Sequence, residues 1–99
     1  MTFAKILPTA LLATTFAIAL PAEAKDPCAT VMCMFGKLKG VVVAECEEPI
    51  ADYFDIVERH HGDIKPDQTA NARKSFLDQC EKADPDATQS INDKFGKVF

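Results

Sequence analysis

The chain has 99 residues, of which 47% are hydrophobic, and its 15 acidic residues outnumber its 11 basic ones, so that the net charge is −4 at neutral pH. This acidic balance argues against nucleic acid or an anionic membrane surface as a partner, because both require a basic face on the protein. The length allows one small domain, which buries only about 60% of its unfolded surface and is marginally stable unless cross-links or a metal support it.

The N-terminal segment has the three-part pattern of a secretory signal peptide. Lys5 supplies positive charge, residues 6–20 are mostly apolar or small, and Ala22-Glu23-Ala24 is a cleavage sequence of the A-x-A type. The apolar run is shorter than the roughly 20 residues of a membrane-spanning helix. We therefore predict that residues 1–24 are removed and that residues 25–99 form a single exported domain without a membrane anchor. A retained, membrane-tethered form is the alternative.

The cysteines favour disulfides over a metal or redox site. Cys28, Cys33, Cys46 and Cys80 all lie in the predicted domain. An even number of cysteines in a short exported chain is typical of a disulfide framework. Their spacing lacks the tight knuckle of structural zinc sites, and a Cys-x-x-Cys redox motif is absent from the sequence. We expect two disulfides, no metal and no cofactor.

The first helix is predicted to begin at Asp26-Pro27, because aspartate is a good N-cap and proline suits the first helical position. It should run to about Leu38, with Gly40 as its C-terminal cap. Apolar residues surround most of its circumference, which indicates a central, buried helix. Gly36 is expected to allow a neighbouring helix to approach closely.

A second helix is predicted after an extended connector, residues 41–44, whose valines should fill the core. Glu48-Pro49 opens the helix, and Arg59 and His60 lie near its end, before Gly62. Its apolar positions have helical spacing: Ile50, Tyr53, Phe54 and Val57.

Two further helices complete the predicted fold. Asp67 is the expected N-cap of the third, whose inward positions are Ala70, Arg73, Phe76, Leu77 and Cys80. Asp84-Pro85 opens the fourth, which is the most polar and should be the least firmly docked, and whose inward positions are Ala87, Ile91, Phe95 and Val98. The predicted fold is all-α, a small bundle of three to four short helices stapled by two disulfides.

The disulfide pairing can be narrowed from helix geometry. Cys28 and Cys33 lie five residues apart, a rotation of about 500°, so that their side chains point about 140° apart and cannot easily bond each other. Each should reach a different element. We favour Cys33–Cys46 and Cys28–Cys80, and the exchanged pairing remains open.

The order of these motifs resembles a family of plasmid conjugation proteins, the TrbM/KikA/MpfK family. The resemblance covers Asp26 to Cys80 and rests on Cys28-x4-Cys33-Met-x-Gly36, Cys46, Asp52-Tyr53-Phe54-x-Ile56 and Thr69-Ala70-x-Ala72-Arg73-x2-Phe76-Leu77-x2-Cys80. It implies an exported, periplasmic accessory of conjugal DNA transfer that acts beside a type IV secretion apparatus. It implies no catalytic residues.

Two residues are candidates for a surface that binds a partner protein. Tyr53 could lie at the rim of such a surface, where an apolar ring with a polar tip is favourable, or it could belong to the core. Arg73 could face a partner, or it could form a structural ion pair with Asp52 or Asp55.

Other polar clusters do not predict chemistry. His60 and His61 would point about 100° apart on a helix and could not readily share one metal ion. The acidic residues at the entrance of the second helix suit its positive N-terminal end, which is a simpler explanation than a pair of catalytic carboxylates: Glu45, Glu47, Glu48 and Asp52.

The sequence therefore favours a non-enzymatic protein that binds components of the conjugation apparatus. A plasmid-encoded toxin or host-range effector is the main alternative. A periplasmic chaperone and a peptidoglycan-active enzyme are less favoured.

Overall fold

The structure, a computed structural model, describes residues 25–99, so that the predicted signal peptide, residues 1–24, lies outside the described residues. The described chain is mainly helical, as predicted, and its only strands within residues 25–99 form one small antiparallel hairpin. Its elements are α1 (Pro27–Leu38), the 3₁₀ helix η3 (Ala44–Cys46), α2 (Glu47–Phe54), β1 (Arg59–His60), β2 (Asp63–Ile64), α3 (Pro66–Asp78) and α4 (Pro85–Phe95).

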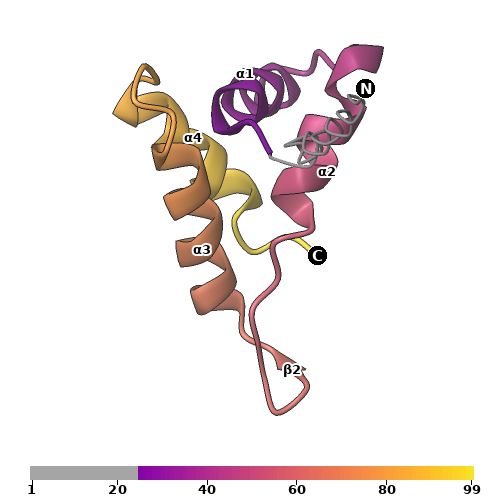
Figure 1. The fold of residues 1–99 in the computed structure, drawn as a ribbon, viewed down its shortest axis with the longest axis vertical. Helices are drawn as coiled ribbons and strands as arrows, with labels where there is room; N and C mark the ends of the chain where they lie inside the picture. The colour runs from indigo at the N-terminus through magenta and orange to yellow at the C-terminus, as the bar shows by residue number, and fades with distance from the viewer. Residues whose placement is uncertain (1–24) are drawn as a thin grey trace, which may run out of the picture.

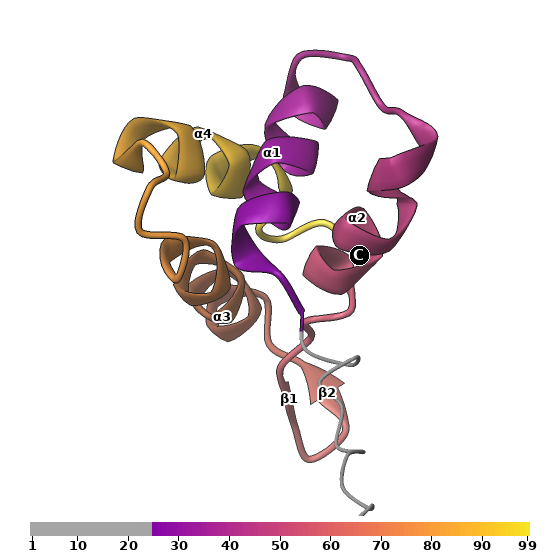
Figure 2. The same cartoon turned by 45° about the horizontal axis from the view of Figure 1, so that its top comes forward.

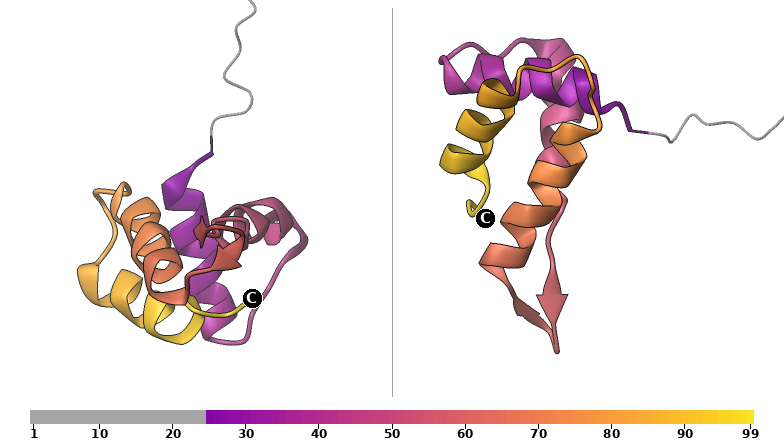
Figure 3. Two further views of the ribbon diagram at one scale, coloured as in Figure 1. Left: turned by 90° about the horizontal axis from the view of Figure 1, so that it is seen from below. Right: turned by 90° about the vertical axis from the view of Figure 1, so that its left-hand side faces the viewer.

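Helix α1 is the centre of the bundle and contacts α2, α3 and α4. Figure 2 shows α1 between α2 on one side and the α3–α4 pair on the other. The β1–β2 hairpin projects from the end of the bundle that is opposite α1 (Figure 1). The segment after α4 crosses from α4 toward α2, which brings distant parts of the chain together (Figures 1 and 3).

Helix α1 begins and ends as its sequence predicts. The Asp26 carboxylate accepts hydrogen bonds from the amides of Cys28 and Ala29 at 3.0 and 3.2 Å, and Gly40 has a φ of +89° just beyond the helix. The helix is central but is not buried on all sides, because its outer face meets no other element. Met34 is fully buried, whereas Met32 is 73% exposed.

The connector after α1 lies at the surface, so the prediction that its valines fill the core is wrong. Val41, Val42 and Val43 are all exposed. The amide of Val41 donates to the carbonyl of Gly36 at 2.8 Å, which turns the chain back along α1. A Cβ atom on Gly36 would lie 2.8 Å from the Val41 carbonyl oxygen. Gly36 therefore admits the backbone of the connector, and not a neighbouring helix.

Helix α2 ends at Phe54, earlier than predicted, and the residues expected to complete it form the β1–β2 hairpin. The hairpin pairs Arg59 with Ile64. His61 and Gly62 have φ values of 55° and 86°, the backbone of a tight two-residue loop with positive φ at both positions. This turn folds the chain back on itself, and a helix cannot continue through it.

The third and fourth helices differ in how well their starts were predicted. Helix α3 begins at Pro66, with Lys65 in the N-cap position, so Asp67 is not the cap; its carboxylate pairs with Lys97 at 2.7 Å. Proline fits the first helical position because it has no amide hydrogen to satisfy there. Helix α4 begins as predicted, with the Asp84 side chain accepting from the amide of Asp86 at 2.9 Å.

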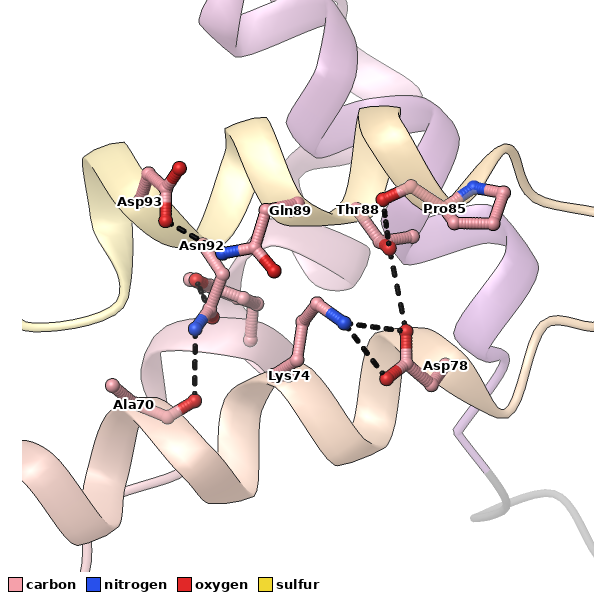
Figure 4. Close-up of polar contacts among 9 residues, drawn as sticks. Ala70, Lys74, Asp78, Pro85, Thr88, Gln89, Asn92 and Asp93 are labelled. Atoms are coloured by element: carbon pink, nitrogen blue, oxygen red, sulfur yellow. Dashed lines mark hydrogen bonds and ion pairs between the residues drawn. The ribbon is translucent and has the colours of Figure 1, made fainter.

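Helix α4 is firmly docked, contrary to expectation, because polar bonds supplement its small apolar face. Ile91 is fully buried. The Asn92 amide donates to the Ala70 carbonyl at 2.9 Å, and the Thr88 hydroxyl lies 3.3 Å from a carboxylate oxygen of Asp78 (Figure 4). These contacts join α3 and α4 along their length.

The two disulfides have the pairing that the sequence favours. Cys28–Cys80 joins the start of α1 to the second residue after the end of α3, and Cys33–Cys46 joins the middle of α1 to η3. Both bonds therefore start from the central helix, and each fixes a different neighbour to it.

Candidate functional site

Arg73 is the organising side chain of the interior. It lies on α3 and is fully buried. Its guanidinium donates to backbone carbonyls of the segment that ends α2 and of the segment that follows α4. The bonds are Nε to Ile56 at 3.0 Å, Nη2 to Phe54 at 3.1 Å, and Nη1 to Phe95, Gly96 and Val98 at 2.9, 3.1 and 2.8 Å. One side chain thus ties α3 to the ends of two other helices.

The predicted ion pair of Arg73 with Asp52 or Asp55 does not form. Asp52 instead pairs with Lys25 at 3.2 Å. Among residues 25–99, the charge of Arg73 is met by carbonyl dipoles and by aromatic rings. The guanidinium carbon lies 5.2 Å from the ring centres of Tyr53 and Phe54, within the range of cation–π attraction. Burial lowers the pKa of the Arg73 guanidinium, and the interaction with Tyr53 partly offsets this effect.

Tyr53 lies beside Arg73 and is also fully buried. Its hydroxyl donates to Oδ1 of Asn92 at 2.7 Å. Burial raises the pKa of the Tyr53 hydroxyl to about 12, and the positive charge of Arg73 offsets part of the rise. The hypothesis that Tyr53 and Arg73 form an exposed partner surface is therefore wrong. Both side chains are buried, and their hydrogen bonds hold α2, α3 and α4 together.

The other polar clusters do not converge on a chemical centre. His60 and His61 lie exposed on the hairpin, with their ring centres 4.1 Å apart. Glu45, Glu47 and Glu48 are exposed around the start of α2. Within the described part of the chain, no group of three or more His, Cys, Asp or Glu side chains is placed to hold a metal ion.

An open cleft of about 640 Å³ lies on the surface between α1, α2, α4, the hairpin and the segment after α4. The Phe54 and Phe95 rings, which meet edge to face with centres 6.0 Å apart, contribute to its lining. Arg73 lies behind this lining, since it bonds the carbonyls of both residues. The complete lining is Lys37, Phe54, Val57, Arg59, Ile64, Lys94, Phe95, Val98 and Phe99.

The charged residues of the cleft are all basic. Lys37 and Lys94 come from different helices, and their ammonium nitrogens lie 5.7 and 5.9 Å from the centre of the Phe95 ring. Arg59 adds a third positive charge from the hairpin. In residues 25–99 the ion pairs involve other basic residues: Lys25, Lys74 and Lys97. The cleft therefore suits a ligand that has both apolar groups and negatively charged groups.

Sequence reasoning missed this cleft. It placed Phe54, Val57, Phe95 and Val98 on inward helix faces, which is a partial signal for a shared apolar surface. It could not find the basic residues, because α1, β1 and α4 are far apart in the chain and only the tertiary fold brings them together.

Residues 19–96 match the TrbM family, which extends the resemblance seen in the sequence through α4. No similar curated protein and no similar solved structure was found. Among residues 25–99, none of the helices combines the length and apolar character needed to cross a membrane. Because the match covers most of the sequence, the chain belongs to the TrbM family of plasmid conjugal transfer proteins.

Proposed function

We propose that this protein is a periplasmic, non-enzymatic accessory of plasmid conjugation that acts by binding a protein of the type IV secretion apparatus. Membership of the TrbM family supports the link to conjugal transfer. The observation that carries the proposed compartment is the pair of disulfides, which use all four cysteines and persist in an oxidising environment such as the periplasm. The signal-peptide pattern of residues 1–24 supports the same compartment.

A binding role is supported by the form of the candidate site. The cleft is lined by apolar and basic side chains, which favour the capture of a partner. Arg73 and Tyr53, the residues with shifted pKa values in the interior, are engaged in structural bonds, and we assign them no catalytic role.

The proposal is tested in a donor cell from which the gene has been deleted. We expect mating frequency to fall and to be restored by the full chain, but not by a variant lacking residues 2–24. The restored protein should be found in the periplasmic fraction, should begin at Lys25, and should have no thiol that reacts with an alkylating reagent before reduction.

Two outcomes would contradict different parts of the proposal. An unchanged mating frequency after deletion would remove the role in transfer. Full restoration of mating by the variant without residues 2–24 would contradict the proposed periplasmic location, because that variant should stay in the cytoplasm.

A further inference from the structure

The basic residues of the cleft stand out against the charge of the whole chain. The sequence contains 15 acidic and 11 basic residues, yet three basic residues and no acidic residue line the cleft. Within residues 25–99, Lys37, Arg59 and Lys94 form no ion pair, whereas Lys25, Lys74 and Lys97 each pair with a neighbouring aspartate. The cleft therefore has a positive charge that remains available to a negatively charged partner.

The shape of the cleft indicates a broad occupant. Its volume of about 640 Å³ lies within the range of about 300–1,000 Å³ that ligand sites occupy. Several apolar side chains of its lining remain in contact with water: Ile64 is 38%, Val98 is 46% and Phe99 is 57% exposed. An occupant must cover this rim as well as the Phe54 and Phe95 rings. A polypeptide with several apolar side chains can do so, whereas a single acyl chain would leave part of the rim in water.

The positions of the three basic residues indicate that the occupant has acidic groups at several points along its length. Lys37 belongs to α1, Lys94 to α4 and Arg59 to the hairpin, so that positive charge reaches the cleft from three elements. A single anionic head group would meet only part of this arrangement. A segment with acidic side chains at several points along its length would complement all three residues.

The cleft is also held in shape before any partner arrives. Arg73 bonds the carbonyls of Phe54, Phe95 and Val98, and its guanidinium carbon lies 5.1 Å from the centre of the Phe99 ring. A preformed site loses less conformational entropy when it binds.

We propose that the cleft binds a segment of a partner protein in which apolar side chains alternate with aspartate or glutamate. This inference rests on the proposed function, since it names the chemistry of the partner and the surface that recognises it.

The chemistry is tested with the purified, oxidised protein and two fluorescent synthetic peptides. One contains leucine and phenylalanine interspersed with glutamate, and the other has lysine in place of every glutamate. Each exposed charge pair adds only a modest amount of binding free energy, and we expect the pairs together to make the glutamate peptide bind at least about tenfold more tightly. The affinity of this peptide should fall with added salt. Equal binding of the two peptides, or no binding of either, would overturn the proposal.

Charge reversal locates the binding surface. The variant Arg59→Glu/Lys94→Glu changes two exposed residues of the cleft and should lose the preference for the glutamate peptide. The variant Lys39→Glu/Lys82→Glu makes the same change in net charge at exposed residues outside the cleft, and it should retain the preference. Equal effects of the two variants would contradict the assignment, and thermal unfolding of both checks that they are folded. Binding to vesicles of phosphatidylcholine and phosphatidylglycerol without peptide binding would assign the cleft to lipid and would also overturn the proposal.

The same variants separate this inference from the proposed function. If gene deletion lowers mating frequency but Arg59→Glu/Lys94→Glu restores it fully, the role in transfer stands and the cleft assignment fails. If the glutamate peptide binds as expected but deletion leaves mating unchanged, the cleft chemistry stands and the role in transfer fails.

Discussion

At the scale of single residues, Arg73 and Tyr53 make most of the side-chain hydrogen bonds that join separate segments in the interior. An arginine suits this place because its planar guanidinium presents five donors in a fixed fork, which a lysine cannot reproduce. Arg73 uses that fork to bind carbonyls of two segments that are distant in the sequence. Within residues 25–99, every buried side-chain nitrogen and oxygen has a hydrogen-bond partner, which is why a buried charge is tolerated.

Replacing Arg73 should therefore destabilise the protein strongly. We expect Arg73→Met to lower the free energy of unfolding by about 3–5 kcal/mol, because it leaves buried carbonyls of α2 and α4 without donors. Arg73→Lys should also be destabilising, since one ammonium group cannot reach all the carbonyls. Urea unfolding of the oxidised proteins measures both effects. A loss of less than about 1 kcal/mol for Arg73→Lys would show that the fork geometry is unimportant.

Tyr53 should make stability depend on pH in the alkaline range. Its pKa is about 12 in the folded protein and has an ordinary value of 10.0. The folded state therefore holds the proton more tightly than the unfolded state, and this contribution is complete below pH 10 and is lost as the pH rises toward 12. The difference corresponds to about 2–3 kcal/mol. Because Tyr53 is the single tyrosine and the chain has no tryptophan, its phenolate absorbance reports this titration directly.

The variant Tyr53→Phe is the control for this prediction. It should lose about 1–3 kcal/mol at neutral pH, because the side-chain oxygen of Asn92 loses its donor. Its unfolding free energy should then fall less than that of the original protein between pH 10 and pH 12. A native tyrosine titration centred near pH 10 would contradict the assigned burial.

At the scale of elements, an aspartate followed by proline predicted the start of a helix correctly, whereas the apolar stripe of α2 did not predict its end. Asp26-Pro27 and Asp84-Pro85 open α1 and α4 as predicted, because an aspartate cap and a proline act within one turn. The predicted end of α2 lay several residues beyond the observed end at Phe54. Its apolar stripe continues to Val57, but Arg73 binds the carbonyls of Phe54 and Ile56 and the chain leaves the helix there.

The junction of α1 with its connector gives a prediction about Gly36. Alanine is intrinsically better than glycine in a helix by about 1 kcal/mol. In Gly36→Ala, however, the new methyl group would lie 2.8 Å from the Val41 carbonyl oxygen, a backbone atom that cannot move freely. We expect a net loss of about 1–3 kcal/mol in urea unfolding, typical of an overpacked site. Ser75→Ala, at an exposed position of α3, should change stability by less than about 0.5 kcal/mol. Stabilisation by Gly36→Ala would show that the connector can give way.

At the scale of the whole molecule, the two disulfides hold the bundle around α1. They close loops of different size, since Cys28 and Cys80 are 52 residues apart and Cys33 and Cys46 are 13 apart. In the chain-entropy model the longer loop contributes about 4 kcal/mol and the shorter one about 3 kcal/mol. Such contributions are large relative to the few kcal/mol that a small core supplies by itself.

Removing the disulfides one at a time tests this difference. The variant Cys28→Ala/Cys80→Ala should be less stable in urea than Cys33→Ala/Cys46→Ala, by about 1 kcal/mol. The remaining disulfide should form in each variant, which thiol alkylation followed by mass spectrometry verifies. The opposite order of stability would show that the local link between α1 and η3 matters more than the length of the closed loop.

The sequence by itself determined the helical class and the family, and it reduced the possible disulfide pairings from three to two. These features depend on local caps, on the residues and their spacing, and on the rotation between two cysteines of one helix. Only the tertiary structure decided that Tyr53 and Arg73 are buried, that the connector valines are exposed and that basic residues of α1, β1 and α4 share one cleft. These features depend on contacts between distant parts of the chain, such as the bond from Arg73 to Val98, 25 residues away, which local patterns do not encode.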